Sequence, residues 1–141
     1  MANKIYPLWA QEIMKGTSNN LLNSAEGATG VFCALVDTGT YTYSTAHQFY
    51  SSLSGVVGTD QEILTKTQTT GTFDGTDLTY TAVTGASVEA LVLYRKNAGA
   101  NTTWPLIAYI DTGVTGLPVP PNGGNITVTW NASGIFKLDN N

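Results

Sequence analysis

Two apolar stretches that lie close together in the chain decide the fold: Val88-Glu-Ala-Leu-Val-Leu-Tyr94 and Trp104-Pro-Leu-Ile-Ala-Tyr-Ile110. Both are short and rich in β-branched and aromatic residues, and the polar segment from Arg95 to Thr103 joins them. This pattern is typical of a β-hairpin. Because both stretches are apolar at most positions, the sequence predicts two central strands of a sheet.

Further strands are expected on both sides of this hairpin. The run from Val31 to Asp37 is almost continuously apolar and ends at a turn, and Tyr41 to Ser44 is a candidate extension of it. Turn residues separate the other β-prone runs, which are Glu62–Thr70, Leu78–Thr84, Ile126–Trp130 and Ile135–Leu138. The sequence therefore predicts a mainly β fold, a single antiparallel domain that is a β-sandwich, a jelly-roll-like fold or a small barrel.

A first short helix is expected from Tyr6 to Gly16. Pro7 suits a first helical position, Leu8, Trp9 and Ile13 are apolar, and Gly16 ends the segment. We interpret residues 1–16 as an N-terminal arm or short helix and residues 17–141 as a single β-rich domain.

A second short helix is expected near residues 45–54. Thr45 and Gln48 have the spacing of a capping box, in which the two side chains bond to free backbone N–H groups. The apolar residues that follow share one helical face, and Gly55 ends the run. His47 would then occupy a partly exposed helical position.

Composition and charge argue against several classes of function. Only 11% of the residues are charged, the formal net charge is -4, and the six Lys and Arg residues form no run longer than a pair. Nucleic-acid binding depends on clustered basic residues, so we expect no nucleic-acid partner. No apolar run approaches the roughly 20 residues that span a bilayer, and the N-terminus does not resemble a signal peptide, so we expect neither membrane insertion nor export.

The sequence offers little catalytic or metal-binding chemistry. His47 and Cys33 are the only His and Cys residues, too few for a structural zinc site, and Cys33 has the surroundings of a small buried hydrophobic residue. The segment Asp74-Gly-Thr-Asp77 is better explained as a turn than as a calcium loop. We therefore expect no catalytic residues, no metal and no cofactor, although a pair of carboxylates that converge only in space stays an open alternative.

The three tryptophans, Trp9, Trp104 and Trp130, have two interpretations. Their large rings could serve as stacking platforms for sugars, or they could pack in a core or an interface. Because each lies among other apolar residues, packing is favoured over sugar binding.

Several longer motifs are similar to those of a known group of proteins. They are Ile5-Tyr-Pro7, the segment from Ala34 to Phe49, Ala108-Tyr-Ile-Asp-Thr-Gly113, Gly116-Leu-Pro-Val119, Pro121-Asn-Gly-Gly124, Ile126-Thr-Val-Thr-Trp130 and Ile135-Phe-Lys-Leu138. On these motifs the chain resembles small structural proteins of tailed bacteriophages and prophages, described as head decoration, cement or virion proteins. The resemblance spans most of the chain and implies no catalytic residue.

The resemblance implies a non-enzymatic virion protein that is made in the cytoplasm of the bacterial host. We expect a capsid decoration or cement protein that binds the outside of the head, with the major capsid protein and copies of itself as partners and a trimer favoured over a dimer. Tyr6, Leu8 and Trp9 would be the contact residues of the N-terminal arm, unless they pack against the domain's own core. The alternative is a tail or fibre module, with glycan binding as one of its functions.

Overall fold

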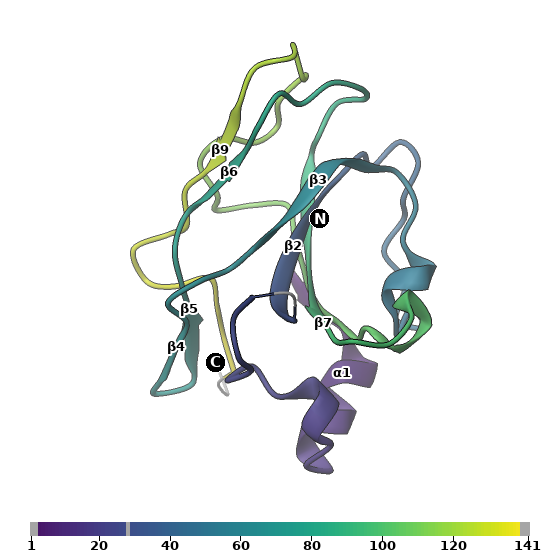
Figure 1. Ribbon diagram of the computed structural model, residues 1–141, viewed down its shortest axis with the longest axis vertical. Helices are drawn as coiled ribbons and strands as arrows, with labels where there is room; N and C mark the ends of the chain where they lie inside the picture. Colours follow the sequence, from purple (N-terminus) through teal and green to yellow (C-terminus); the bar gives the residue numbers. More distant parts are fainter. Residues whose placement is uncertain (1–2, 28, 139–141) are drawn as a thin grey trace.

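The computed structural model describes residues 3–27 and 29–138 and contains a five-stranded antiparallel sheet. Its strands, in spatial order, are β1 (Lys4–Ile5), β8 (Leu106–Ile110), β7 (Ala90–Lys96), β2 (Gly30–Val36) and β3 (Val56–Glu62). β7 and β8 form the predicted hairpin. β2 pairs with β7 along its whole length, and the two strands lie side by side in Figure 1. The central strands are confirmed, and they are almost entirely buried, as their continuous apolar sequences predict.

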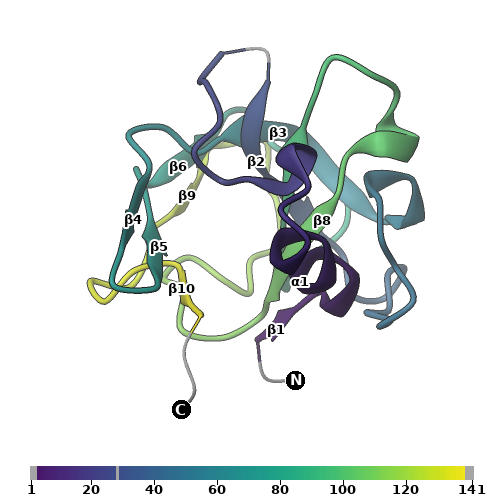
Figure 2. The same cartoon turned by 90° about the horizontal axis from the view of Figure 1, so that it is seen from below.

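Two smaller antiparallel sheets lie beside this sheet. One contains β10 (Phe136–Lys137), β5 (Thr72–Asp74) and β4 (Thr67–Thr69), and the other pairs β6 (Leu78–Tyr80) with β9 (Ile126–Val128). Seen from below, they lie opposite β2 and β8 across the molecule (Figure 2). The fold is therefore mainly β, as predicted, and its sheets are consistent with a small β-sandwich that carries one short helix.

That helix, α1 (Pro7–Met14), confirms the first helical prediction, with Pro7 at its start. Short 3-10 turns follow at η1 (Ser18–Asn20), η2 (Tyr50–Ser52) and η3 (Asn101–Thr103). Within the described residues no helix has the length and apolar character that crossing a membrane requires.

The N-terminal segment packs on the domain's own core, which is the alternative that the sequence analysis left open for Tyr6 and Trp9. Tyr6 is 0% exposed and Trp9 is 1% exposed, while Leu8 is partly buried. The Tyr6 hydroxyl shares a hydrogen bond of 2.7 Å with the Tyr41 hydroxyl, and the Trp9 indole N–H donates to the Asn20 carbonyl. Large aromatic side chains with satisfied polar groups stabilise a core, and here they are unavailable to another protein.

The predicted α-helix near residues 45–54 is wrong, because the only helical turn there is η2. The backbone of this segment pairs with the start of β8 instead: the Leu106 N–H donates to the Gln48 carbonyl, and the Tyr50 N–H donates to the Trp104 carbonyl. Phe49 and Pro105 form a β-bridge between these bonds. Pairing with a neighbouring strand has overridden the local capping pattern.

The predicted strand from Glu62 to Thr70 is only partly confirmed, because β3 ends at Glu62 and only β4, Thr67–Thr69, lies within the rest of the range. Residues 41–44 form no strand, and β1, β5 and most of β3 were not expected. In β3, Gly58 has a φ of +74°, and the pairing with β2 shifts register at this point. Such a β-bulge interrupts the alternating pattern by which a strand is recognised in a sequence.

Candidate functional site

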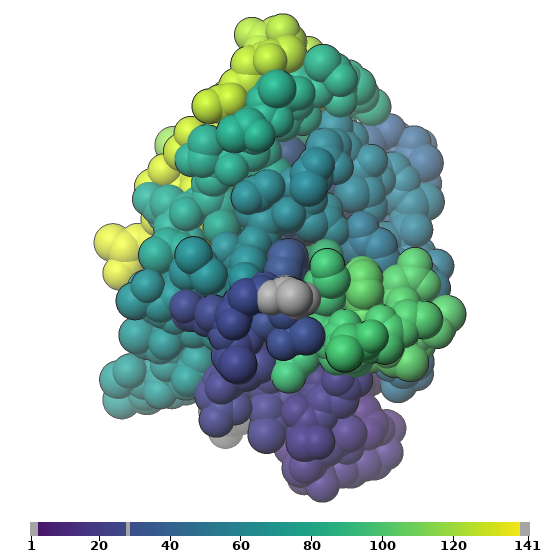
Figure 3. All heavy atoms as spheres, viewed as in Figure 1, coloured from purple at the N-terminus to yellow at the C-terminus, as the bar shows by residue number. Residues whose placement is uncertain are grey.

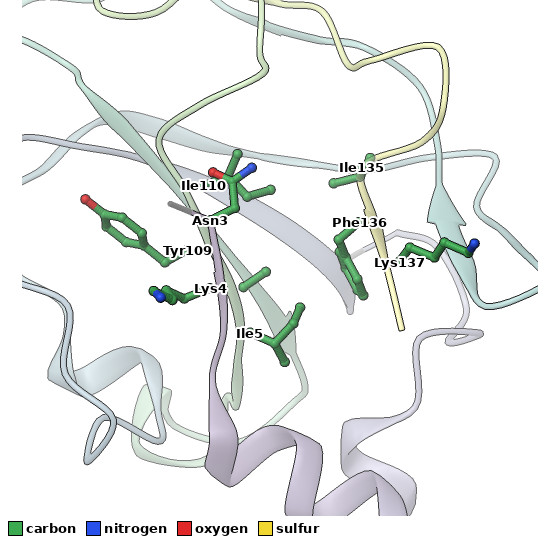
Figure 4. A pocket seen from close by; sticks show the side chains of 9 residues that line it. Asn3, Lys4, Ile5, Tyr109, Ile110, Ile135, Phe136 and Lys137 are labelled. Atoms are coloured by element: carbon green, nitrogen blue, oxygen red, sulfur yellow. The ribbon is translucent and has the colours of Figure 1, made fainter. Parts of the chain in front are cut away.

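A slot of about 260 Å³ opens between the five-stranded sheet and β10, and its lining includes the polar residues Asn3, Lys4 and Lys137 as well as apolar ones. The sheet contributes Ile5 from β1 and Ile110 from β8, and the C-terminal segment contributes Ile135 and Phe136. Figure 4 shows Ile5 and Phe136 on facing sides of the slot, with the Lys137 side chain directed away from it. The slot therefore lies between segments from the two ends of the chain.

A second depression of about 440 Å³ continues from this slot. It shares Ile110, Ile135 and Phe136 with the slot and extends to Val114 and Trp130. We call the two together the terminal groove. Its lining is partly apolar and partly polar, and it leaves space that the side chains of the described residues do not fill.

A separate pocket of about 310 Å³ lies at the other side of the five-stranded sheet, and we call it the aromatic pocket. The sheet register explains part of it, because Phe32 of β2 lies opposite Tyr94 of β7 and their side chains point to the same face. Lys96 follows two positions after Tyr94 and shares this face. Another wall of the pocket comes from Tyr50 in η2 and from Trp104, the residue after η3. The turns η2 and η3 are in contact. Figure 3 shows the segments around them side by side, residues 97–104 in green and residues 45–55 in blue. The pocket is lined by Phe32, Tyr50, Val56, Gly58, Thr59, Asp60, Tyr94, Lys96 and Trp104.

The rings of the aromatic pocket form a row with Tyr94 at its centre. Tyr94 stacks on Trp104, with ring centroids 5.8 Å apart and planes 12° from parallel, and on Phe32, with centroids 5.9 Å apart. The Tyr50 centroid is 4.5 Å from that of Tyr94. Tyr94 is buried while Phe32, Tyr50 and Trp104 are partly exposed, so the row presents ring surface to solvent.

Asp60 fixes the two tyrosines of the pocket. The hydroxyls of Tyr50 and Tyr94 both donate hydrogen bonds of 2.8 Å to the same Asp60 carboxylate oxygen. Burial raises the pKa of Asp60 above its ordinary value, although the two tyrosine bonds and the charge of Lys96 act in the opposite direction. Burial and the Asp60 charge also raise the pKa of both tyrosines, so each stays a hydrogen-bond donor at neutral pH.

Lys96 places a positive charge at this pocket. Its ammonium nitrogen lies 5.0 Å from the ring centroid of Phe32 and 5.2 Å from that of Trp104, within the range of a cation–π interaction. Among the described residues, ion pairs form at Lys15 with Glu12 and at Lys66 with Glu26, whereas Lys96 has no carboxylate at ion-pair distance. The pocket thus combines ring surfaces, a buried carboxylate and a cation that faces the rings.

The other residues considered from sequence lie elsewhere. Cys33 is buried, and burial raises the pKa of its thiol to about 12. His47 is partly exposed and shares a hydrogen bond with the Tyr41 hydroxyl, and Asp77 accepts a hydrogen bond from the Trp130 backbone. No group of three or more His, Cys, Asp and Glu side chains with metal-binding geometry is found in residues 3–27 and 29–138.

The three tryptophans differ in their surroundings. Trp9 and Trp130 are buried, as the packing interpretation predicts, but Trp104 is partly exposed in the aromatic pocket. The sequence reasoning did not single out the partners of Trp104. Tyr94 and Lys96 at alternating positions near the end of an apolar run are a signal for a shared face, whereas Tyr50 and Asp60 reach the pocket through tertiary pairing that no local pattern shows.

Comparison with protein-family models and with curated proteins gives no match. The chemistry of the two sites is therefore inferred from their own residues.

Proposed function

We propose that the chain is a non-enzymatic structural protein of a tailed-bacteriophage virion that binds the outside of the head and stabilises it as a decoration or cement protein. The resemblance supports this proposal, and some of its motifs begin in strands while others, such as Gly116–Val119 and Pro121–Gly124, lie in the connection between β8 and β9. The segment beginning at Ala34 starts in β2, Ala108–Gly113 begins in β8, and Ile126–Trp130 begins with β9. The partners are the major capsid protein and further copies of this chain, with a trimer favoured.

The terminal groove is the observation that carries the proposal. Open apolar depressions on a folded protein are places where another protein inserts side chains and removes apolar surface from water. A protein that clamps a shell acts by burying surface against its neighbours, and it needs such a depression more than it needs a catalytic centre. We therefore assign the groove as the contact with the capsid protein.

The second candidate is a tail or fibre module that binds glycans. The aromatic pocket favours it, because exposed aromatic rings are stacking surfaces for sugars as well as packing surfaces for proteins. The position of the protein in the particle separates the two candidates.

Sedimentation of the purified protein with heads that lack it tests the groove. A negative charge in an apolar contact loses its hydration on binding, so Val114→Asp and Ile5→Asp should each reduce the bound fraction by at least tenfold. Val114 lies outside the named strands and packs partly on the core, so the fold of this variant is checked as well as its binding.

The matched control is Met14→Asp, at an apolar residue of α1 that is 81% exposed and does not line the groove. It should bind heads like the unchanged protein, and circular dichroism should show the same fold for all variants. The assignment of the groove is contradicted if both groove variants bind heads as well as Met14→Asp does. The proposed function is contradicted if the unchanged protein does not bind heads.

A further inference from the structure

The aromatic pocket has features beyond those that a packing cluster requires. A core cluster is closed to solvent, but Phe32, Tyr50 and Trp104 are each partly exposed around a space of about 310 Å³. This volume is at the lower end of the range for small-ligand sites. Aromatic walls with a few fixed polar groups are the usual composition of such sites.

The pocket is held in shape before any ligand arrives. Asp60 accepts hydrogen bonds from both tyrosine hydroxyls, and the Trp104 indole N–H donates to the Gly99 carbonyl at 2.9 Å. These bonds fix the ring orientations, so a ligand does not have to order them. A preorganised ring surface of this kind suits a rigid ligand with a flat apolar face.

Lys96 supplies the positive charge of the pocket, which also contains the Asp60 carboxylate. Its ammonium group faces the rings of Phe32 and Trp104, and no carboxylate of the described chain pairs with it. An anionic group beside the rings would gain a charge-assisted hydrogen bond. The exposed Thr59, which also lines the pocket, adds a hydroxyl that donates or accepts.

From this arrangement we propose that the aromatic pocket binds a carbohydrate that carries a carboxylate, such as a uronic acid or a sialic acid residue. The apolar C–H face of the sugar ring packs on Trp104, with Tyr50, whose ring plane is 64° from that of Trp104, at its edge. The carboxylate pairs with Lys96, and a sugar hydroxyl bonds with Thr59. A nucleic acid is a poorer match, because a phosphate backbone requires several clustered cations and this protein carries a net charge of -4. The inference goes beyond the decoration role and does not depend on where the protein sits in the particle.

Two-dimensional amide NMR with D-glucuronic acid, N-acetylneuraminic acid and D-glucose tests the proposal. We expect at least one of the two acids to shift the signals of Thr59, Lys96 and the Trp104 indole N–H, at a concentration at least tenfold lower than glucose requires. Lys96→Met should abolish the advantage of the acid over glucose, because methionine keeps an apolar chain against the rings and removes the charge. A glycan array read with the same proteins extends the test to larger acidic glycans.

Lys15→Met is the matched control, since Lys15 lies outside the pocket and pairs with Glu12. It should bind the acid like the unchanged protein. The carbohydrate assignment is overturned if no acidic sugar or glycan shifts the pocket signals, if adenosine monophosphate binds more tightly than every acid tested, or if Lys96→Met binds the acid as well as Lys15→Met does. Head binding is measured separately, so failure here leaves the decoration proposal unaffected.

Discussion

The five-stranded sheet and the sheet of β4, β5 and β10 differ in how they are held. In β7 and β8 almost every side chain is buried, and each strand pairs with neighbours on both sides. In β4 every side chain is exposed, and in β5 only Phe73 is fully buried. The comparison indicates that apolar burial along whole strands stabilises the first sheet, whereas the second is held by a few buried side chains, such as Phe73, and by a few long-range bonds.

Those bonds come from distant parts of the chain. The Ile135 N–H donates to the Phe73 carbonyl, and the Leu138 N–H donates to the Gly71 carbonyl, both at 2.8 Å. Trp130 similarly connects the end of β9 to the turn before β6, through bonds to Thr76 and Asp77. The terminal groove and its C-terminal wall therefore belong to the less deeply packed part of the molecule.

The largest effect is expected for Leu93→Ala in β7. Leu93 is 0% exposed, so its truncation removes buried apolar contacts and leaves a cavity. The free energy of unfolding should fall by about 2–5 kcal/mol. The matched change in the outer sheet, Gln68→Ala at an exposed position of β4, should change it by no more than about 0.5 kcal/mol. Urea denaturation measures both, and equal losses contradict the comparison.

A smaller effect is expected for Gly116→Ala, in a turn beside β9. Gly116 has a φ of +110°, and an added methyl group would overlap the Thr127 carbonyl oxygen. The substitution should lower the free energy of unfolding by about 1–3 kcal/mol. Gly113→Ala is its control, because Gly113 also has a positive φ but has open space around its Cα. If Gly116→Ala lowers the free energy of unfolding by no more than Gly113→Ala does in the same thermal or urea experiment, the turn at Gly116 does not position β9.

The smallest effect is expected for Asp60→Asn and appears as a pH dependence. Burial raises the pKa of Asp60 in the folded protein above its value in the unfolded chain. The protonated Asp60 therefore stabilises the fold fully below the unfolded-state pKa, and this contribution is lost as the pH rises through the folded-state pKa. Asparagine does not titrate in this range. The stability of the unchanged protein relative to Asp60→Asn should therefore increase as the pH falls from 7 to 4. Urea denaturation at both pH values measures this difference, and a constant or opposite trend contradicts the assigned direction.

The difference between the two sheets also explains which elements could be predicted from the sequence. The strands β2, β7 and β8 could be predicted because each is a continuous apolar run, which indicates a buried strand. The helix α1 could be predicted because it carries a proline at its first position. The helix expected near residues 45–54 failed because backbone pairing with Trp104 and Leu106 replaced local capping. The two-residue strand β1 and the bulged strand β3 have no periodic pattern long enough to recognise.

The two sites were likewise predictable only where their residues lie in a recognisable local pattern. Trp104 was recognised as a candidate sugar platform, and Tyr94 lies in a strand that was predicted. The terminal groove was missed, because Ile5 and Phe136 come from opposite ends of the chain and only the folded sheets bring them together. The sequence could not separate the two interpretations of the N-terminal segment, because an aromatic segment has the same sequence signature whether it docks on a partner or on its own core.

Cryo-electron microscopy of the particle that carries this chain tests the central proposal most directly. The account predicts density for this protein on the outside of the head, bridging capsid subunits at three-fold or quasi-three-fold positions, with the terminal groove turned towards the shell. Density confined to the tail, or no density on the particle, would contradict it.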